Sequence, residues 1–145
     1  MKSITALDHA DAWAAMTAAH EVIKNDDKPL VIAVVDSHGE LLSLFRHASA
    51  MFSSIAIATN KAYTAARLRR PSSAVGQKSR SVDQGFDIAS FGDPRVTGFG
   101  GGLPIIHDGH VIGAVGVSGL SEADDVAVAE LAVRAIKARW NKQAS

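Results

Sequence analysis

Two short turns, each flanked by strand-forming residues, constrain the fold of this chain more than any other feature. Residues 30–35 are apolar and mostly β-branched, so they predict a central strand that is covered on both faces. Residues 36–39 carry the turn, in which Asp36 can bond to the amides that follow it and Gly39 can adopt a positive φ. Residues 41–46 are therefore expected to return as a second strand.

A second pair of strands is predicted near the end of the sequence. Asp108-Gly109 is typical of a two-residue hairpin turn, and it separates residues 103–106 from residues 110–118. Gly113 and Gly116 in the last strand indicate places where another element packs closely. Because hairpin strands pair antiparallel, we expect an α+β fold rather than a nucleotide-binding βαβ array.

The first helix is predicted over residues 7–24. Thr5 and the residues after it fit a capping pattern, in which a hydroxyl accepts a hydrogen bond from a free amide at the helix start. Trp13, Met16 and Ile23 follow at spacings of three and seven residues, which predicts an apolar stripe facing the core.

Further helices are predicted between and after the hairpins. Residues 52–69 form an alanine-rich helix that ends before Pro71, and residues 72–92 are expected to hold one or two short helices. Ser121 is expected to cap the N-terminus of a final helix. The predicted order is α-ββ-α(α)-ββ-α, within a single domain that spans residues 1–145.

Composition narrows the class of function. Basic and acidic residues both number 15, so the chain lacks the net positive charge that favours nucleic acids or anionic membranes, while self-association is permitted. No cysteine is present, which excludes thiol catalysis, thiolate zinc sites and iron–sulfur clusters. We find no secretion signal and no apolar run long enough to cross a bilayer. We therefore expect a cytoplasmic protein without a nucleic-acid or membrane partner.

The histidines of the first helix are candidate cofactor ligands. His9 and His20 extend the apolar stripe, and an imidazole beside Trp13 and Met16 can ligate haem iron while the apolar side chains cover the porphyrin. The first cofactor hypothesis is that the protein binds haem with His20 as the ligand of the iron, and His9 is the next candidate ligand. The alternative is a half-buried histidine that bonds to a carbonyl group.

The glycine-rich stretch at residues 98–102 precedes a strand, whereas phosphate-binding loops of the common types open a helix. We interpret it as a tightly bent crossing whose backbone approaches a neighbouring element. The alternative is that Gly100, Gly101 and Gly102 line a cofactor pocket with their backbone amides.

Four segments together resemble the GlcG/HbpS family, a small haem-binding or haem-degrading domain that also forms the C-terminus of PduO-type corrinoid adenosyltransferases. The segments are IAVVDSHGEL at 32–41, SIAIATNKAYTA at 54–65, GGGLPI at 100–105 and GHVIGAVGVSG at 109–119. They occur in the family's order and cover nearly the whole chain. The resemblance implies a profilin-like antiparallel sheet of four or five strands flanked by helices, assembled into a homo-oligomer.

The resemblance also implies a function. Some relatives bind haem, which favours an oligomeric ligand-binding protein that takes haem or a related tetrapyrrole in an accessory or sensory role. One alternative is an enzyme of haem breakdown or small-molecule metabolism, although no nucleophile–base pair is visible in the sequence. The other alternative is an accessory protein for cobalamin-dependent diol or glycerol metabolism, which rests on analogy.

In the implied sheet the first and last strands are antiparallel neighbours, so the two hairpin turns lie at the same end. These turns carry three histidines and two acids: His38, His107, His110, Asp36 and Asp108. Imidazole and carboxylate groups suit zinc, nickel or copper, so a divalent transition metal is a second cofactor hypothesis. The alternative is that these turn histidines point into solvent.

Overall fold

A four-stranded sheet in the order β2-β1-β4-β3 forms the centre of the molecule, and every neighbouring pair of strands is antiparallel. The computed structural model describes residue 1 and residues 3–145. The strands are β1 (Val31–Asp36), β2 (Leu41–Arg46), β3 (Gly102–His107) and β4 (His110–Ser118). The predicted pairing of both hairpins is therefore confirmed.

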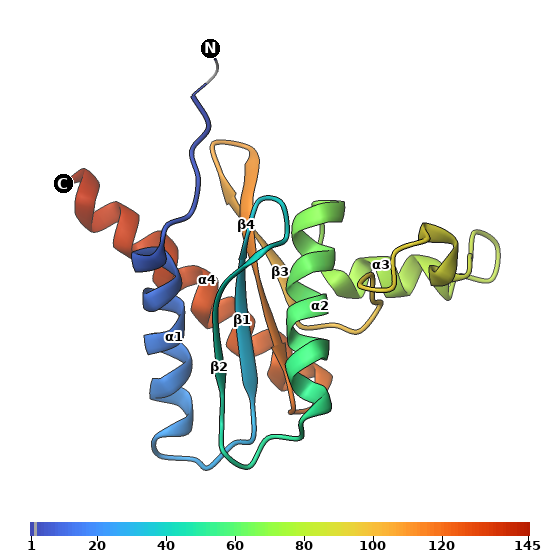
Figure 1. Cartoon of the computed structure of the whole chain (residues 1–145), viewed down its shortest axis with the longest axis horizontal. Helices are drawn as coiled ribbons and strands as arrows, with labels where there is room; N and C mark the ends of the chain where they lie inside the picture. The colour runs from blue at the N-terminus through green and yellow to red at the C-terminus, as the bar shows by residue number, and fades with distance from the viewer. Residues whose placement is uncertain (2) are drawn as a thin grey trace.

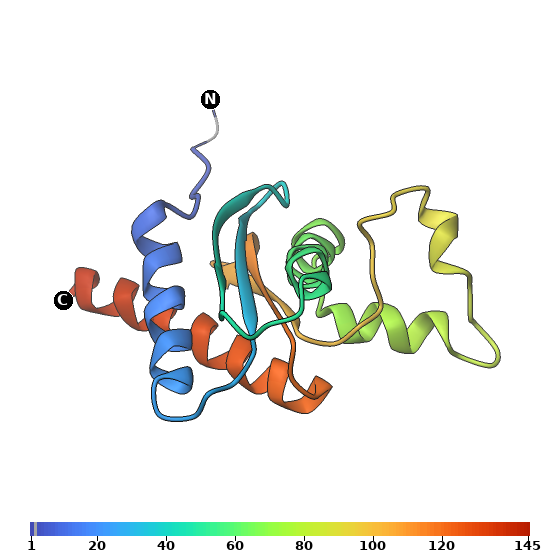
Figure 2. The same ribbon diagram turned by 60° about the horizontal axis from the view of Figure 1, so that its bottom comes forward.

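Helices cover both faces of the sheet (Figure 1). On one face lie α1 (His9–Ile23) and α4 (Glu122–Ala144), and on the other lies α2 (Ser53–Leu68). Two short helices, α3 (Ser72–Ser79) and the 3-10 helix η1 (Ile88–Phe91), project away from the sheet (Figure 2). The predicted α+β class and element order are thus confirmed.

The strand β1 is buried on both faces, as its composition predicts. Ile32 and Val34 pack in the core beneath α1 and α4, whereas Val31, Ala33 and Val35 pack beneath α2. Alanines of α2 allow its backbone to approach the sheet closely: Ala58, Ala62, Ala65 and Ala66.

Gly116 of β4 is part of this close approach. A Cβ atom at Gly116 would lie 2.1 Å from the carbonyl oxygen of Ala58, so no larger residue fits without moving α2. The prediction that Gly116 marks close packing is confirmed.

Both hairpin turns have the predicted conformation. The Oδ1 atom of Asp36 accepts hydrogen bonds from the amides of His38 at 2.8 Å and Glu40 at 3.1 Å, and Gly39 has a φ of 88°. Asp108 and Gly109 have φ values of 48° and 76°, the two positive angles that a type I′ turn requires. Local sequence therefore determines both reversals of the chain.

Two predictions about α1 are wrong. The cap is Asp8 rather than Thr5, because the Asp8 side chain accepts from the Asp11 amide at 2.9 Å and the Asp11 side chain accepts from the Asp8 amide at 3.0 Å. Trp13 does not face the core, since it is 71% exposed. The buried face consists mainly of smaller residues: Ala12, Ala15, Met16, Ala19 and Ile23.

A polar contact joins α1 to α4. The Oδ1 atom of the buried Asp11 accepts hydrogen bonds from Nη1 of Arg139 at 2.7 Å and from Nε1 of Trp140 at 2.9 Å. The two helices are thereby held in one layer over the sheet. None of the helices in the described part of the chain has the length and apolar character needed to cross a bilayer.

Candidate functional site

A groove lies between α1 and the edge strand β2. Its volume is about 370 Å³, and its lining is mainly apolar with one imidazole; we name it the α1–β2 groove. The lining residues are Trp13, Met16, Thr17, His20, Ser43, Leu44 and Phe45. The structure thus brings His20 together with the two apolar residues that the sequence placed beside it.

His20 and His9 have different surroundings. His20 is exposed in the wall of the α1–β2 groove, so the alternative of a half-buried histidine does not apply to it. His9 is the first residue of α1 and does not line the groove. Eleven residues separate the two, which corresponds to roughly 16 Å along a helix. One iron atom cannot therefore reach both imidazoles.

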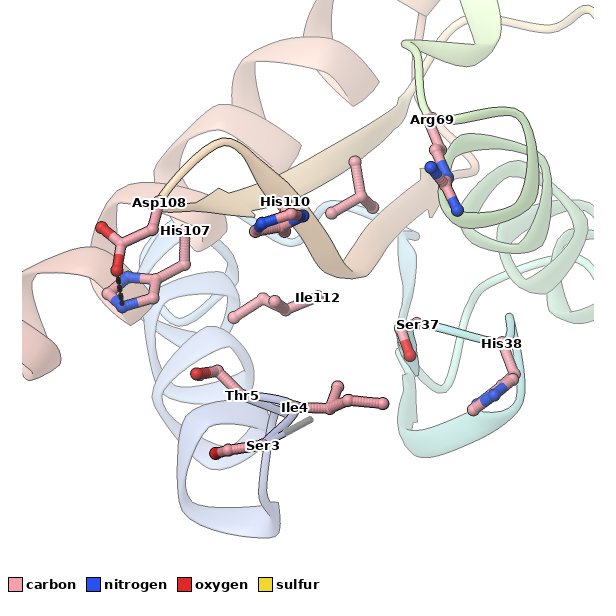
Figure 3. A pocket seen from close by; sticks show the side chains of 11 residues that line it. Ser3, Ile4, Thr5, Ser37, His38, Arg69, His107, Asp108, His110 and Ile112 are labelled. Atoms are coloured by element: carbon pink, nitrogen blue, oxygen red, sulfur yellow. Dashed lines mark ion pairs between the residues drawn. The ribbon is translucent and has the colours of Figure 1, made fainter. Parts of the chain in front are cut away.

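A larger cavity of about 770 Å³ opens where the two hairpin turns meet the N-terminal segment (Figure 3). We name it the sheet-end pocket. His38, His107, His110 and Asp108 line it, so the prediction that these turns lie at one end of the sheet is confirmed. Asp36 is not in the lining, because its carboxylate bonds to amides within its own turn.

These side chains do not form a metal site. In residues 1 and 3–145 no group of three or more His, Asp or Glu side chains is arranged to hold a metal ion. The β1–β2 turn begins at Asp36, level with Gly113, whereas β4 continues three residues farther to His110, roughly 10 Å along a strand. Figure 1 shows the β3–β4 turn reaching beyond the β1–β2 turn.

His107 is also held away from the other two histidines. Its ring packs edge-on against Trp140 of α4, with the ring centroids 5.0 Å apart. The structure therefore does not support the hypothesis that His38, His107 and His110 share a divalent metal with Asp36 or Asp108.

A third hollow, of about 220 Å³, adjoins a buried ion pair that the sequence analysis did not single out. Nζ of Lys61 donates to the carbonyl oxygen of Val117 at 2.8 Å and to Oδ2 of Asp125 at 3.0 Å, and both charged side chains are 4% exposed. The other oxygen of Asp125 accepts from the Leu120 amide at 3.0 Å. The pair therefore joins α2, β4 and α4.

Burial raises the pKa of the Asp125 carboxyl, and the hydrogen bond and charge of Lys61 oppose that rise. The sequence held one signal for this pair. Lys61 occurs three residues after Ala58 and four before Ala65, which places a charged group on the buried face of α2. A lysine at such a position needs a buried acidic partner.

The glycine stretch adjoins this third hollow and not the α1–β2 groove. The Gly100 amide donates to Oε1 of Glu122 at 2.8 Å, and the Gly102 amide donates to Oγ of Ser72 at 2.9 Å. A Cβ atom at Gly102 would lie 2.2 Å from the carbonyl oxygen of Lys61, so the interpretation as a tightly bent crossing is confirmed.

The glycines do not lie near the α1–β2 groove. Gly100, Gly101 and Gly102 lead into β3, at the opposite edge of the sheet from β2. The structure therefore does not bring them to His20, and at least two of their amides are used within the protein.

Comparison with known proteins adds independent evidence. A model of the family described as "Haem degrading protein HbpS-like" matches residues 7–134. Among curated proteins, the "Uncharacterized 15.0 kDa protein in dhaT-dhaS intergenic region" of Citrobacter freundii is 39% identical over 105 residues, which are 72% of this chain and 74% of that protein.

Two solved structures are similar over most of their length. The Klebsiella pneumoniae protein ORFY has a TM-score of 0.86 at 28% sequence identity, and the match covers 95% of each chain. The complex of PduOC with haem has a TM-score of 0.82 at 28% identity, and the match covers 90% of this chain and 95% of that chain. The element arrangement described above is thus shared with a haem-bound protein.

Proposed function

The chain belongs to the HbpS-like family, and from this membership we propose that it binds haem or a related tetrapyrrole in the α1–β2 groove, with His20 as the axial ligand to the iron. The observation that carries the proposal is the exposed imidazole of His20 in the wall of an otherwise mainly apolar groove. The haem complex of PduOC supports haem as the ligand, because that protein shares the fold.

The lining of the groove suits a planar apolar ring. Met16 of α1 and Phe45 of β2 line the groove with apolar surface, while the imidazole of His20 can donate a nitrogen lone pair to iron. Trp13 at the rim exposes a large aromatic surface that a bound macrocycle would cover. The residues present therefore fit a haem group, which would supply the redox-active iron.

The groove is open on one side and lies toward the lower end of the volume range for small-molecule sites. A tetrapyrrole bound in such an open groove keeps part of its surface exposed, which another partner can cover. We propose that a second copy of the chain supplies it, in a homo-oligomer with an accessory or sensory role in the cytoplasm.

Titration with hemin, monitored by the Soret band, tests the proposal. The wild-type protein should shift the Soret band, and His20→Ala should abolish the shift without loss of helical signal in circular dichroism. His9→Ala is the matched control, because His9 is an exposed histidine of the same helix outside the groove. We expect this variant to bind hemin as the wild type does.

The outcomes separate the alternatives. A wild-type spectrum identical to that of free hemin would overturn the haem proposal. Binding that survives in His20→Ala but disappears in His110→Ala would move the haem to the sheet-end pocket. Loss of helical signal in His20→Ala would indicate a structural role for this histidine.

Haem breakdown is the second candidate function, and the description of the family favours it. In that case the bound haem should disappear when a reductant and oxygen are supplied, with catalase present to remove free peroxide. A stable Soret band under these conditions would favour binding without degradation.

A further inference from the structure

The sheet-end pocket collects more basic than acidic side chains. Arg69, His38, His107 and His110 line it, and the one carboxylate in its lining belongs to Asp108. Oδ2 of Asp108 lies 3.4 Å from Nε2 of His107, and the Asp108 side chain is 88% exposed. Figure 3 shows this pair at one side of the pocket, away from Arg69.

Arg69 is the permanent charge of the pocket. Within the described part of the chain no carboxylate forms an ion pair with it. Figure 3 shows its side chain at the end of α2, with His110 and the turn at Ser37 and His38 on neighbouring sides. Its guanidinium group is therefore available to a ligand.

The backbone at Arg69 is also unusual. Among the described residues, Arg69 and Asp108 are the two non-glycine residues with positive φ, at 56° and 48°, and both line this pocket. The angle at Asp108 follows from its hairpin turn. Arg69 occupies the left-handed position at the end of a helix, where glycine carries no steric penalty. Strained backbone of this kind clusters at ligand sites.

We propose that the sheet-end pocket binds a small organic anion whose carboxylate or phosphate group is held by Arg69. A guanidinium group is planar and can donate two parallel hydrogen bonds to either kind of anion. The hydroxyl groups of Thr5 and Ser37 are further donors in the lining, and Ile4 and Ile112 offer apolar contacts to a carbon skeleton (Figure 3). The volume of about 770 Å³ lies within the range of small-molecule sites.

Two acids lie near the histidines of the pocket. Asp108 lies beside His107, and Oδ1 of Asp36 lies 4.0 Å from Nδ1 of His38. Both carboxylates therefore face a histidine, and neither forms an ion pair with Arg69.

Calorimetric titration at constant ionic strength tests the proposal with four probes. Inorganic phosphate and acetate carry the anionic group alone, while phenyl phosphate and benzoate add an apolar body. We expect each aromatic probe to bind about tenfold more tightly than its parent anion, because the ring is removed from water.

A pair of neighbouring arginine variants locates the site. Arg69→Gln should weaken binding of phenyl phosphate and benzoate by about tenfold or more, since a charge-assisted hydrogen bond is lost. Arg70→Gln is the matched control, because Arg70 is exposed, does not line the pocket and donates from Nε to the carbonyl oxygen of Leu68. Glutamine keeps a side chain at the positive-φ position, so the backbone strain is unchanged.

The results separate this site from the haem proposal. No binding of any probe at millimolar concentration would overturn the anion site, as would equal losses in Arg69→Gln and Arg70→Gln. Arg69→Gln should leave the hemin spectrum unchanged, because Arg69 does not line the α1–β2 groove.

Discussion

Lys61 is the residue on which the junction of α2, β4 and α4 most depends. Its ammonium group lies between the Val117 carbonyl and the Asp125 carboxylate, and the ion pair is buried. Lys61→Met should destabilise the protein by about 3–5 kcal/mol at pH 7, because it leaves Asp125 buried without its counter-charge. Urea unfolding measures this cost, and Lys78→Met at an exposed position of α3 should change the stability little.

The cost of Lys61→Met should also depend on pH. Burial already raises the pKa of Asp125, and removal of Lys61 raises it further, since the lysine is the main group opposing the effect of burial. A carboxyl group with a folded pKa above its unfolded value destabilises the protein as the pH rises through that interval. Below the interval the group is protonated in both states, so the penalty is absent.

The variant should therefore be closer to the wild type in stability near pH 4 than near pH 7. Unfolding curves of both proteins at the two pH values provide the comparison. An equal difference in stability at both would show that the loss comes from packing and hydrogen bonds rather than from the unpaired charge.

Among the contacts between secondary-structure elements, the contact of α2 with β4 leaves the least room for a larger side chain. The backbone of α2 approaches Gly116 so closely that Gly116→Ala should separate helix and strand, with a loss of about 3 kcal/mol. Gly109→Ala is the matched control, because a Cβ atom at Gly109 meets nothing within 4 Å and only the positive φ opposes it. That strain costs roughly 1–2 kcal/mol.

Thermal and urea unfolding of the two variants measure the difference. Similar losses of stability in Gly116→Ala and Gly109→Ala would mean that α2 moves away from β4 without cost. The close approach would then contribute little to stability.

The elements that the sequence predicts correctly are those whose signals lie within a few residues. Asp108-Gly109 determines its turn because both residues tolerate positive φ, and the apolar composition of β1 determines its burial. The cap of α1 is different, since Thr5 and Asp8 are both capping residue types three positions apart. The choice of Asp8 depends on Asp11, which is fixed by Arg139 and Trp140 from the far end of the chain.

For the candidate sites too, the sequence predicts what depends on nearby residues and misses what depends on distant ones. Helical spacing was sufficient to place His20 beside Met16. Strand order was sufficient to bring His38 and His110 to one pocket, but the offset between the two hairpins depends on sheet register. The pairing of Lys61 with Asp125 joins residues 64 positions apart, so neither residue identifies the other in the sequence.

For the molecule as a whole, the edge strand β2 is the surface most suited to a second copy. Leu41 and Leu42 expose apolar side chains beside the α1–β2 groove, and Phe52 follows at the start of α2. An edge strand with exposed apolar residues and free backbone groups is prone to pair with another chain.

We expect the wild-type protein to sediment as an oligomer at micromolar concentration, and Leu42→Asp to shift it toward the monomer. Ile106→Asp is the matched control, because Ile106 is an exposed apolar residue of the opposite edge strand, β3. A monomeric wild type would contradict the proposed assembly. Equal dissociation by both variants would place the contact elsewhere.

The contact of Asp11 with Arg139 and Trp140 has a consequence for the order of events during synthesis. Asp11 is separated from Arg139 by 128 positions and from Trp140 by 129 positions in the sequence. These residues must meet before α1 is fixed on the sheet. While a ribosome still holds α4, the nascent chain already carries α1 and both hairpins, yet the face that α1 shares with α4 is uncovered. Such intermediates expose apolar surface and are clients for chaperones. The groove proposed for haem has α1 as one wall, so we expect it to form only after α4 has left the ribosome.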